Sequence, residues 1–177
     1  MIALDTNILV YARRLETTHH KTAHRLLTRL AEGGDPWCIP WPCVYEFLRV
    51  VTHPRVFSPP TPLEAALEGL GQLFDSPSLH LLGATTNHRL LLVQTLLEGH
   101  ATGNLVHDGH IAALLHEHGV REIWTTDRDF SRFPGIVVRN PFAERILSEP
   151  RARGWTSGRR RRPTAKGVRR QRAGGAS

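Results

Sequence analysis

Two carboxylates each stand directly after an apolar segment that is typical of a buried strand. Asp5 follows residues 2–4, and Asp127 follows residues 122–126. Parallel strands of one sheet end at the same edge, and open α/β sheets hold their ligand-binding crevice just beyond that edge. The sequence therefore predicts that Asp5 and Asp127 lie close together in a site.

Two further acids fall on helices that approach the same edge. Asp108 lies in the first turn of a helix predicted over 107–118, and Glu46 lies early in a helix predicted over 42–52. Each acid alone could be structural, as a cap, a surface turn or a charge that favours the helix dipole by ~0.3–1 kcal/mol. Four such acids at one sheet edge favour a functional site over four independent structural roles.

Crowded carboxylates require a compensating charge. Two unit charges ~5 Å apart repel by roughly 3 kcal/mol at an effective dielectric constant near 20, which raises the pKa of at least one of them. A ligand set made only of oxygens favours Mg²⁺ or Mn²⁺ over zinc or copper. Several carboxylates with positions left open for water and phosphate are typical of metal-dependent phosphodiester hydrolysis.

The elements that would position these acids alternate between strands and helices. Apolar segments predict strands over residues 2–4, 37–40, 79–82, 122–126 and 136–138. Apolar periodicity predicts helices over 8–12, 18–32, 42–52, 63–74, 87–98 and 107–118, the first of them capped by Thr6 or Asn7. This alternation predicts an α/β domain with a mainly parallel sheet of about five strands.

Four segments around the acids occur in a specific order within residues 1–145. They are Leu4-Asp5-Thr6-Asn7-Ile8-Leu9, Tyr45-Glu46-Phe47-Leu48-Arg49, Val106-His107-Asp108-Gly109-His110-Ile111-Ala112-Ala113 and Trp124-Thr125-Thr126-Asp127-Arg128-Asp129-Phe130. In combination they resemble a PIN domain, and most closely the VapC-type ribonuclease toxin of prokaryotic type II toxin–antitoxin pairs. Any one of these motifs alone is weak, whereas the set of four is specific.

The resemblance implies a PIN-like (Rossmann-like) α/β/α sandwich and Mg²⁺- or Mn²⁺-dependent endoribonuclease activity on RNA. It assigns catalysis and metal binding to an acidic quartet of Asp5, Glu46, Asp108 and Asp127, in which Asp5 and Asp108 match the most direct metal ligands. It assigns supporting roles to Thr6, Asn7 and Asp129. It also implies a homodimer and a cognate antitoxin whose helix or tail blocks the acidic site.

Charge divides the chain of 177 residues into two unequal parts. The net charge is +7, yet ten of the 23 Lys and Arg residues lie within 151–177, where no acid occurs, so residues 1–150 carry a net −3. We predict a nuclease domain over 1–149 and a basic tail over 150–177 that is disordered when alone, because the tail has too little apolar surface to form a core.

The basic tail departs from the compact ending that is usual for such toxins, so its role does not follow from the resemblance. Its arginine clusters are Arg159, Arg160, Arg161, Arg162, Arg169, Arg170 and Arg172. Such clusters bind nucleic acid by releasing counterions and carry no base specificity of their own. A solubilising extension is the alternative interpretation.

Other sequence features exclude several classes of protein. No apolar run approaches ~18 residues, and the first residues lack a basic leader, so we expect neither a membrane helix nor a signal peptide. Cys38 and Cys43 have the spacing of neither a zinc knuckle nor a redox pair, which favours a cytoplasmic location. His107 and His110 share a helix face without cysteine partners, which disfavours zinc and leaves a phosphate contact open.

Two other functions compete with the toxin hypothesis. One is a PIN nuclease that works in RNA maturation without an antitoxin. The other is a non-catalytic module that binds RNA or the ribosome through its basic tail. The intact acidic quartet disfavours the second alternative, and a small antitoxin gene beside this one would separate the toxin from the first alternative.

Overall fold

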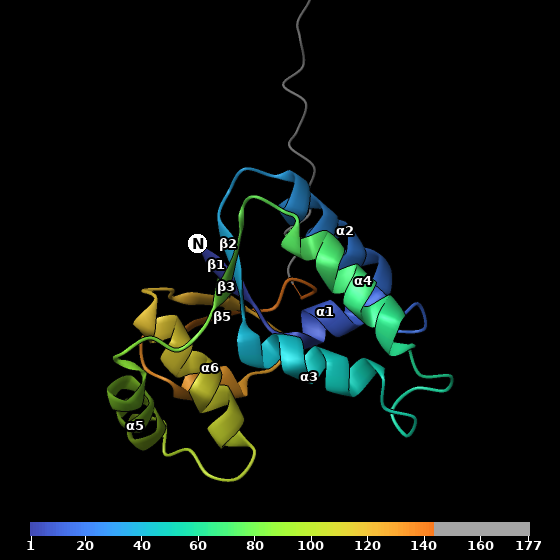
Figure 1. The fold of residues 1–177 in the computed structure, drawn as a ribbon. Helices are drawn as coiled ribbons and strands as arrows, with labels where there is room; N and C mark the ends of the chain where they lie inside the picture. The colour runs from blue at the N-terminus through green and yellow to red at the C-terminus, as the bar shows by residue number, and fades with distance from the viewer. Residues whose placement is uncertain (144–177) are drawn as a thin grey trace, which may run out of the picture. The chain divides into compact units, whose positions relative to one another are not determined.

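The computed structural model describes residues 1–143 (Figure 1). The predicted domain boundary at residue 149, the basic tail and all its arginines from Arg159 to Arg172 lie outside the described residues. The strands are β1 (Ile2–Leu4), β2 (Trp37–Pro40), β3 (Leu79–Leu82), β4 (Glu122–Trp124) and β5 (Val137–Arg139). The helices are α1 (Thr6–Arg13), α2 (His20–Glu32), α3 (Trp41–Val51), α4 (Leu63–Phe74), α5 (His88–Glu98), α6 (Leu105–Glu117) and the 3-10 helix η1 (Asp129–Arg132).

Within residues 1–143, the strands form one parallel sheet of five strands in the order β3-β2-β1-β4-β5. The chain therefore adds β2 and β3 on one side of β1, and then crosses back to add β4 and β5 on the other side. Such a reversal of strand order is where open α/β sheets form their ligand crevice. The prediction of an α/β fold with a parallel sheet is confirmed.

The register of β1 and β4 places the two strand-end acids near each other. Leu4 pairs with Trp124, the last residue of β4, and the amide of Asp5 donates to the carbonyl of Trp124 at 3.2 Å. Figure 1 shows α2 and α4 on one side of the sheet and α5 and α6 on the other. This layered arrangement confirms the predicted α/β/α sandwich.

Apolar side chains of the central strands and of α1, α2, α3, α4 and α6 form the core. Ala3, Leu4 and Ile123 are fully buried, as are Ala112 and Leu115 of α6. This packing holds the first turn of α6, which carries Asp108, against the sheet. Among the described residues, no helix combines the length and apolar character needed to cross a membrane.

The cap of the first helix differs from the prediction. Asp5, rather than Thr6 or Asn7, is the N-cap of α1, and its side chain accepts a hydrogen bond from the amide of Thr6. The helix begins immediately after β1, so the strand-end acid itself satisfies a free amide of the first turn. Asp5 consequently has a structural role in addition to any chemical one.

Candidate active site

Asp5 is held by hydrogen bonds from three neighbours. Its carboxylate accepts from the Thr6 amide at 2.7 Å, from the Asn7 side chain at 2.5 Å and from the Thr125 hydroxyl at 2.6 Å. Only 6% of Asp5 is exposed, and burial raises its pKa from 3.8 to about 6, although the Thr125 and Thr6 hydrogen bonds act against that rise. Asp5 is thus a firmly oriented carboxylate in a poorly solvated position.

Thr125 is a site residue that was not predicted from the sequence. Its fully buried hydroxyl donates to Asp5 and accepts from the Asn7 side chain at 2.7 Å and from the Asp127 amide at 2.9 Å. One hydroxyl therefore connects the end of β1, the start of α1 and the loop after β4. Its place directly after β4, in register with Asp5 after β1, was the signal that could have identified it.

Three carboxylates form a cluster that could hold a cation. They belong to Asp108, Asp127 and Asp129, and one carboxylate oxygen of each lies within 4.8 Å of those of the other two. We call these residues the three-carboxylate cluster. The Asp129 amide donates to the Asp127 carboxylate at 2.8 Å, which fixes the turn that presents both acids. Asp129, predicted only as a supporting residue, therefore lies in one cluster with Asp108 and Asp127.

Glu46 lies in a different electrostatic setting from the three aspartates. It accepts hydrogen bonds from the Thr6 hydroxyl at 3.0 Å and from Arg49 at 2.9 Å, and it pairs with His107 at 3.2 Å. These partners, His107 first, lower the pKa of Glu46 to about 2, and Glu46 in turn raises the pKa of His107. Arg49 and His107 thus stabilise the ionised form of the Glu46 carboxylate.

Within residues 1–143, Asp108 has no ion pair with a cationic side chain, although His107 partly opposes the rise of its pKa. Burial raises its pKa from 3.8 to about 6, and the negative charges of Asp127 and Asp5 add to that rise. A positive charge placed among Asp5, Asp108 and Asp127 would relieve this repulsion. The oxygen-only donor set fits a hard divalent cation such as Mg²⁺ or Mn²⁺.

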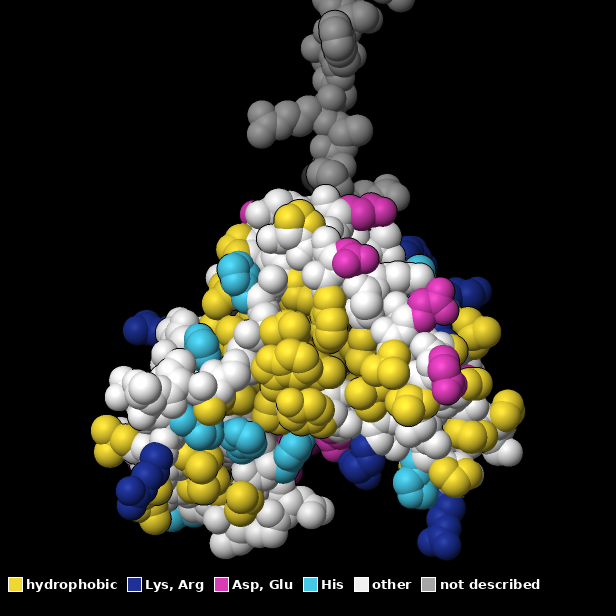
Figure 2. Space-filling model, in the orientation of Figure 1, with side chains coloured by type: hydrophobic (Ala, Val, Ile, Leu, Met, Phe, Trp, Pro, Cys, Tyr) yellow, Lys and Arg dark blue, Asp and Glu magenta, His cyan; other side chains and the backbone are white. Residues whose placement is uncertain are grey.

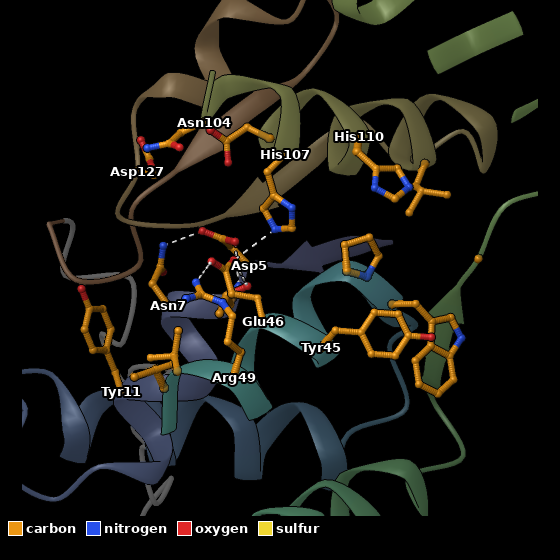
Figure 3. A pocket seen from close by; sticks show the side chains of 18 of the residues that line it. Asp5, Asn7, Tyr11, Tyr45, Glu46, Arg49, Asn104, His107, His110 and Asp127 are labelled. Atoms are coloured by element: carbon orange, nitrogen blue, oxygen red, sulfur yellow. Dashed lines mark hydrogen bonds and ion pairs between the residues drawn. The ribbon is translucent and has the colours of Figure 1, made fainter. Parts of the chain in front are cut away.

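All four members of the acidic quartet line one open pocket of about 1030 Å³. Figure 3 shows Asp5, Glu46 and His107 in its middle, Asp127 and Asn104 on one side, and Tyr45 and His110 on the other. The structure thus brings the four predicted acids together in one pocket, which Thr6 and Asn7 also line. The arrangement can bind a cation and leaves room for an extended polyanionic substrate next to it.

The chain is similar to known proteins over most of its length. The PIN domain model matches residues 2–136. Ribonuclease VapC48 of Mycobacterium tuberculosis (strain H37Rv) is 34% identical over 139 residues, which is 78% of this chain and 96% of that protein. Ribonuclease VapC37 of the same strain is 35% identical over 141 residues, which is 80% of this chain and 97% of that protein.

Solved structures show the same fold at lower identity. VapBC2 from Rickettsia felis, bound to a promoter DNA fragment, matches with a TM-score of 0.58 and 21% identity over 79% of this chain and 98% of that one. The sarcin-ricin loop cleaving toxin VapC20 of Mycobacterium tuberculosis matches with a TM-score of 0.55 and 16% identity over 77% of this chain and 98% of that one. The resemblance to VapC proteins is therefore confirmed, and the chain belongs to the PIN domain family.

Proposed function

We propose that this chain is an endoribonuclease that depends on Mg²⁺ or Mn²⁺ and is the toxic component of a toxin–antitoxin pair. The observation that carries the proposal is the convergence of Asp5, Asp108 and Asp127 in an open pocket, with the pKa values of Asp5 and Asp108 raised to about 6. The similarity to proteins named as VapC ribonucleases supports RNA as the substrate. The nuclease domain would span residues 1–149.

Distinct tasks follow for the residues of the site. Asp5, Glu46, Asp108 and Asp127, which line one pocket, would hold the cation, and Asp129 would join them through its closeness to Asp108 and Asp127. A bound cation would supply charge stabilisation and an activated water. Thr125, Asn7 and Thr6 orient the Asp5 carboxylate through their hydrogen bonds. Arg49 and His107, which both pair with Glu46, would also donate hydrogen bonds to a phosphate that enters the pocket.

Sequencing of RNA ends tests this proposal directly. Purified protein is incubated with total RNA in Mg²⁺ and, in parallel, in a chelator. We expect new RNA ends at defined positions in Mg²⁺ and none in the chelator. Binding of RNA without any new ends would refute the nuclease and favour the non-catalytic RNA-binding alternative.

An antitoxin partner and a homodimer are further parts of the proposal. Several of the similar solved structures are VapBC complexes, including one from Salmonella typhimurium bound to DNA, which supports an antitoxin for this chain. An acidic pocket would suit a basic side chain of that antitoxin. Co-expression with the product of a small neighbouring gene should suppress RNA cleavage, whereas a nuclease of RNA maturation would stay active.

The stability of the metal-free protein is expected to depend on pH through Asp5 and Asp108. Folding raises the pKa of both carboxyl groups from 3.8 to about 6. Between pH 4 and pH 6 the folded protein therefore binds protons that the unfolded chain has already released. The free energy of unfolding should therefore fall as pH rises from about 4 to 6, by up to about 3 kcal/mol for Asp5. Folding lowers the pKa of Glu46 from 4.5 to about 2, so this group makes the free energy of unfolding rise as pH increases between these two values.

Metal should reverse this loss of stability. A cation at a hundred times its dissociation constant adds ~2.7 kcal/mol to the free energy of unfolding. Thermal unfolding followed by circular dichroism at pH 4 to 7, with chelator or with Mn²⁺, measures both effects. Equal melting temperatures in chelator and in millimolar Mn²⁺ at neutral pH would argue against a preformed metal site.

The basic tail is expected to add RNA affinity without contributing to the chemistry. Ten Lys and Arg residues lie within 151–177, and basic residues that neutralise phosphates make binding strongly dependent on salt. Deletion of 151–177 should weaken RNA binding and flatten its salt dependence, while cleavage in Mg²⁺ at saturating RNA remains. An unchanged salt slope after the deletion would show that the tail does not touch RNA.

A further inference from the structure

The pocket that holds the acidic quartet also contains an aromatic pair. Trp41 and Tyr45, four residues apart on α3, stack with ring centroids 5.6 Å apart and an angle of 26° between their planes. Both line the pocket, and 63% of Tyr45 is exposed. We call this pair the aromatic shelf. A large aromatic ring that is left this open beside a polar site is available to a ligand.

Packing holds the aromatic shelf in place from behind. The edge of Phe74 on α4 contacts Trp41 at a centroid distance of 6.1 Å and an angle of 64°. The backbone after β3 also approaches the indole, since a Cβ built on Gly83 would lie 3.5 Å from Trp41 Cδ1. Tyr45 therefore rests on a fixed partner, and a ligand that stacks on it meets a surface already ordered before binding.

The aromatic shelf and the acidic centre are parts of one short segment of α3. Tyr45 and Glu46 are consecutive, and successive helical residues point about 100° apart, so the two side chains reach different parts of one pocket. Figure 3 shows Tyr45 directed away from Glu46, Asp5 and His107, on the side of the pocket where His110 lies. Figure 2 shows hydrophobic side chains gathered near the start of α3, with several histidines beside them.

Arg49 and His107 line the same pocket as the aromatic shelf and the carboxylates. Arg49 follows Tyr45 by one turn of α3, its side chain is 64% exposed, and it lines the same pocket as His107. A nucleotide presents just such a pair of chemical features, an anionic phosphate and a flat base a short distance away. Arg49 contacts Glu46 through Nη2 alone and its side chain is largely exposed, so its other guanidinium N–H groups are open to a phosphate. An apolar protein segment would use the rings but would make no use of these donors.

We propose that the aromatic shelf is a nucleobase-stacking subsite that holds one unpaired base next to the phosphodiester at the acidic centre. The proposal rests on the proposed ribonuclease function and adds a requirement for single-stranded substrate, because a base inside a duplex cannot lie on Tyr45. Stacking on aromatic rings tolerates any base and is a general means of holding single strands. Unpaired bases are also the ones that proteins reach most readily in RNA.

The test compares three proteins, the wild type, Tyr45→Phe and Tyr45→Leu. Phenylalanine keeps the aromatic face, whereas leucine keeps apolar surface and helix propensity but removes the face. Each full-length protein is titrated in chelator with a labelled short oligoadenylate and with an abasic oligoribonucleotide of the same length. The two probes carry the same phosphates, so any affinity that the basic tail gains from phosphates cancels in the ratio of their dissociation constants.

We expect the wild type and Tyr45→Phe to prefer the oligoadenylate over the abasic probe by about tenfold, and Tyr45→Leu to lose most of this preference. Circular dichroism should show that both variants are folded. The subsite would be overturned if Tyr45→Leu preferred the oligoadenylate as strongly as the wild type does, or if the wild type showed no preference. The first of these results would favour a protein partner whose apolar side chains bind the aromatic shelf.

Binding is measured in chelator, where no cleavage is expected, so the stacking subsite and the ribonuclease function are tested separately. RNA cleavage in Mg²⁺ is measured on the same preparations. A wild type that cuts RNA while Tyr45→Leu keeps the full base preference refutes the stacking subsite alone. A wild type that prefers the oligoadenylate through Tyr45 but never cuts refutes the ribonuclease and retains the base-binding surface.

Discussion

Asp108→Asn is expected to lower the rate of RNA cleavage by ~10²-fold or more while the protein stays folded. Asparagine has nearly the size of aspartate but removes the charge that a hard cation requires. Asp108 is partly buried among negative charges, and its pKa of about 6 shows that its ionised form is disfavoured without a cation. The variant should therefore be at least as stable as the wild type in chelator, because one source of repulsion has gone.

The matched control for this variant is Asp75→Asn. Asp75 is an exposed acid at the carboxyl end of α4 and does not line the pocket. Cleavage of a structured RNA in Mg²⁺ is compared for the three proteins, with circular dichroism as the folding control. Folded Asp108→Asn that cuts RNA as fast as the Asp75→Asn control would contradict the assignment of the acidic quartet.

Much of the fold could be predicted because its determinants are local. The apolar segment before Asp5 and the turn residues after each helix locate the elements to within a few residues, as with α6, predicted from 107 and observed from Leu105. On α5 the apolar residues predict the helix but not which side chains are buried, since Leu90 and Leu97 are 71% and 69% exposed. A helix can be recognised from its own residues, whereas the face it buries depends on its neighbours.

The candidate site was predicted only in part, because its geometry depends on contacts between distant segments. The acids at strand ends could be grouped once a parallel sheet was assumed, and all four line the pocket. The sequence could not show that Arg49 and His107 pair with Glu46, or that Asp129 joins Asp108. These pairings connect α3, α6 and the loop after β4, and only the strand order brings those elements together.

Thr125→Val is expected to impair both stability and activity, although Thr125 carries no charge. Valine matches threonine in shape but lacks the hydroxyl, so the Asp127 amide loses its acceptor and Asp5 loses a donor. Removing one partner from a buried hydrogen bond costs about 1–3 kcal/mol of unfolding free energy. Chemical denaturation of Thr125→Val, compared with Thr125→Ser, which keeps the hydroxyl, measures this cost.

The same substitution should move the pH profile of cleavage to higher pH. The Thr125 hydroxyl makes the largest of the contributions that keep the pKa of Asp5 from rising further than about 6. Without this donor the ionised carboxylate is less favoured, so the pKa of Asp5 rises and a smaller fraction is ready to bind metal at neutral pH. Thr125→Ser should retain the wild-type profile. A Thr125→Val enzyme that loses stability but keeps the wild-type pH profile would show that Thr125 only supports the fold and does not tune Asp5.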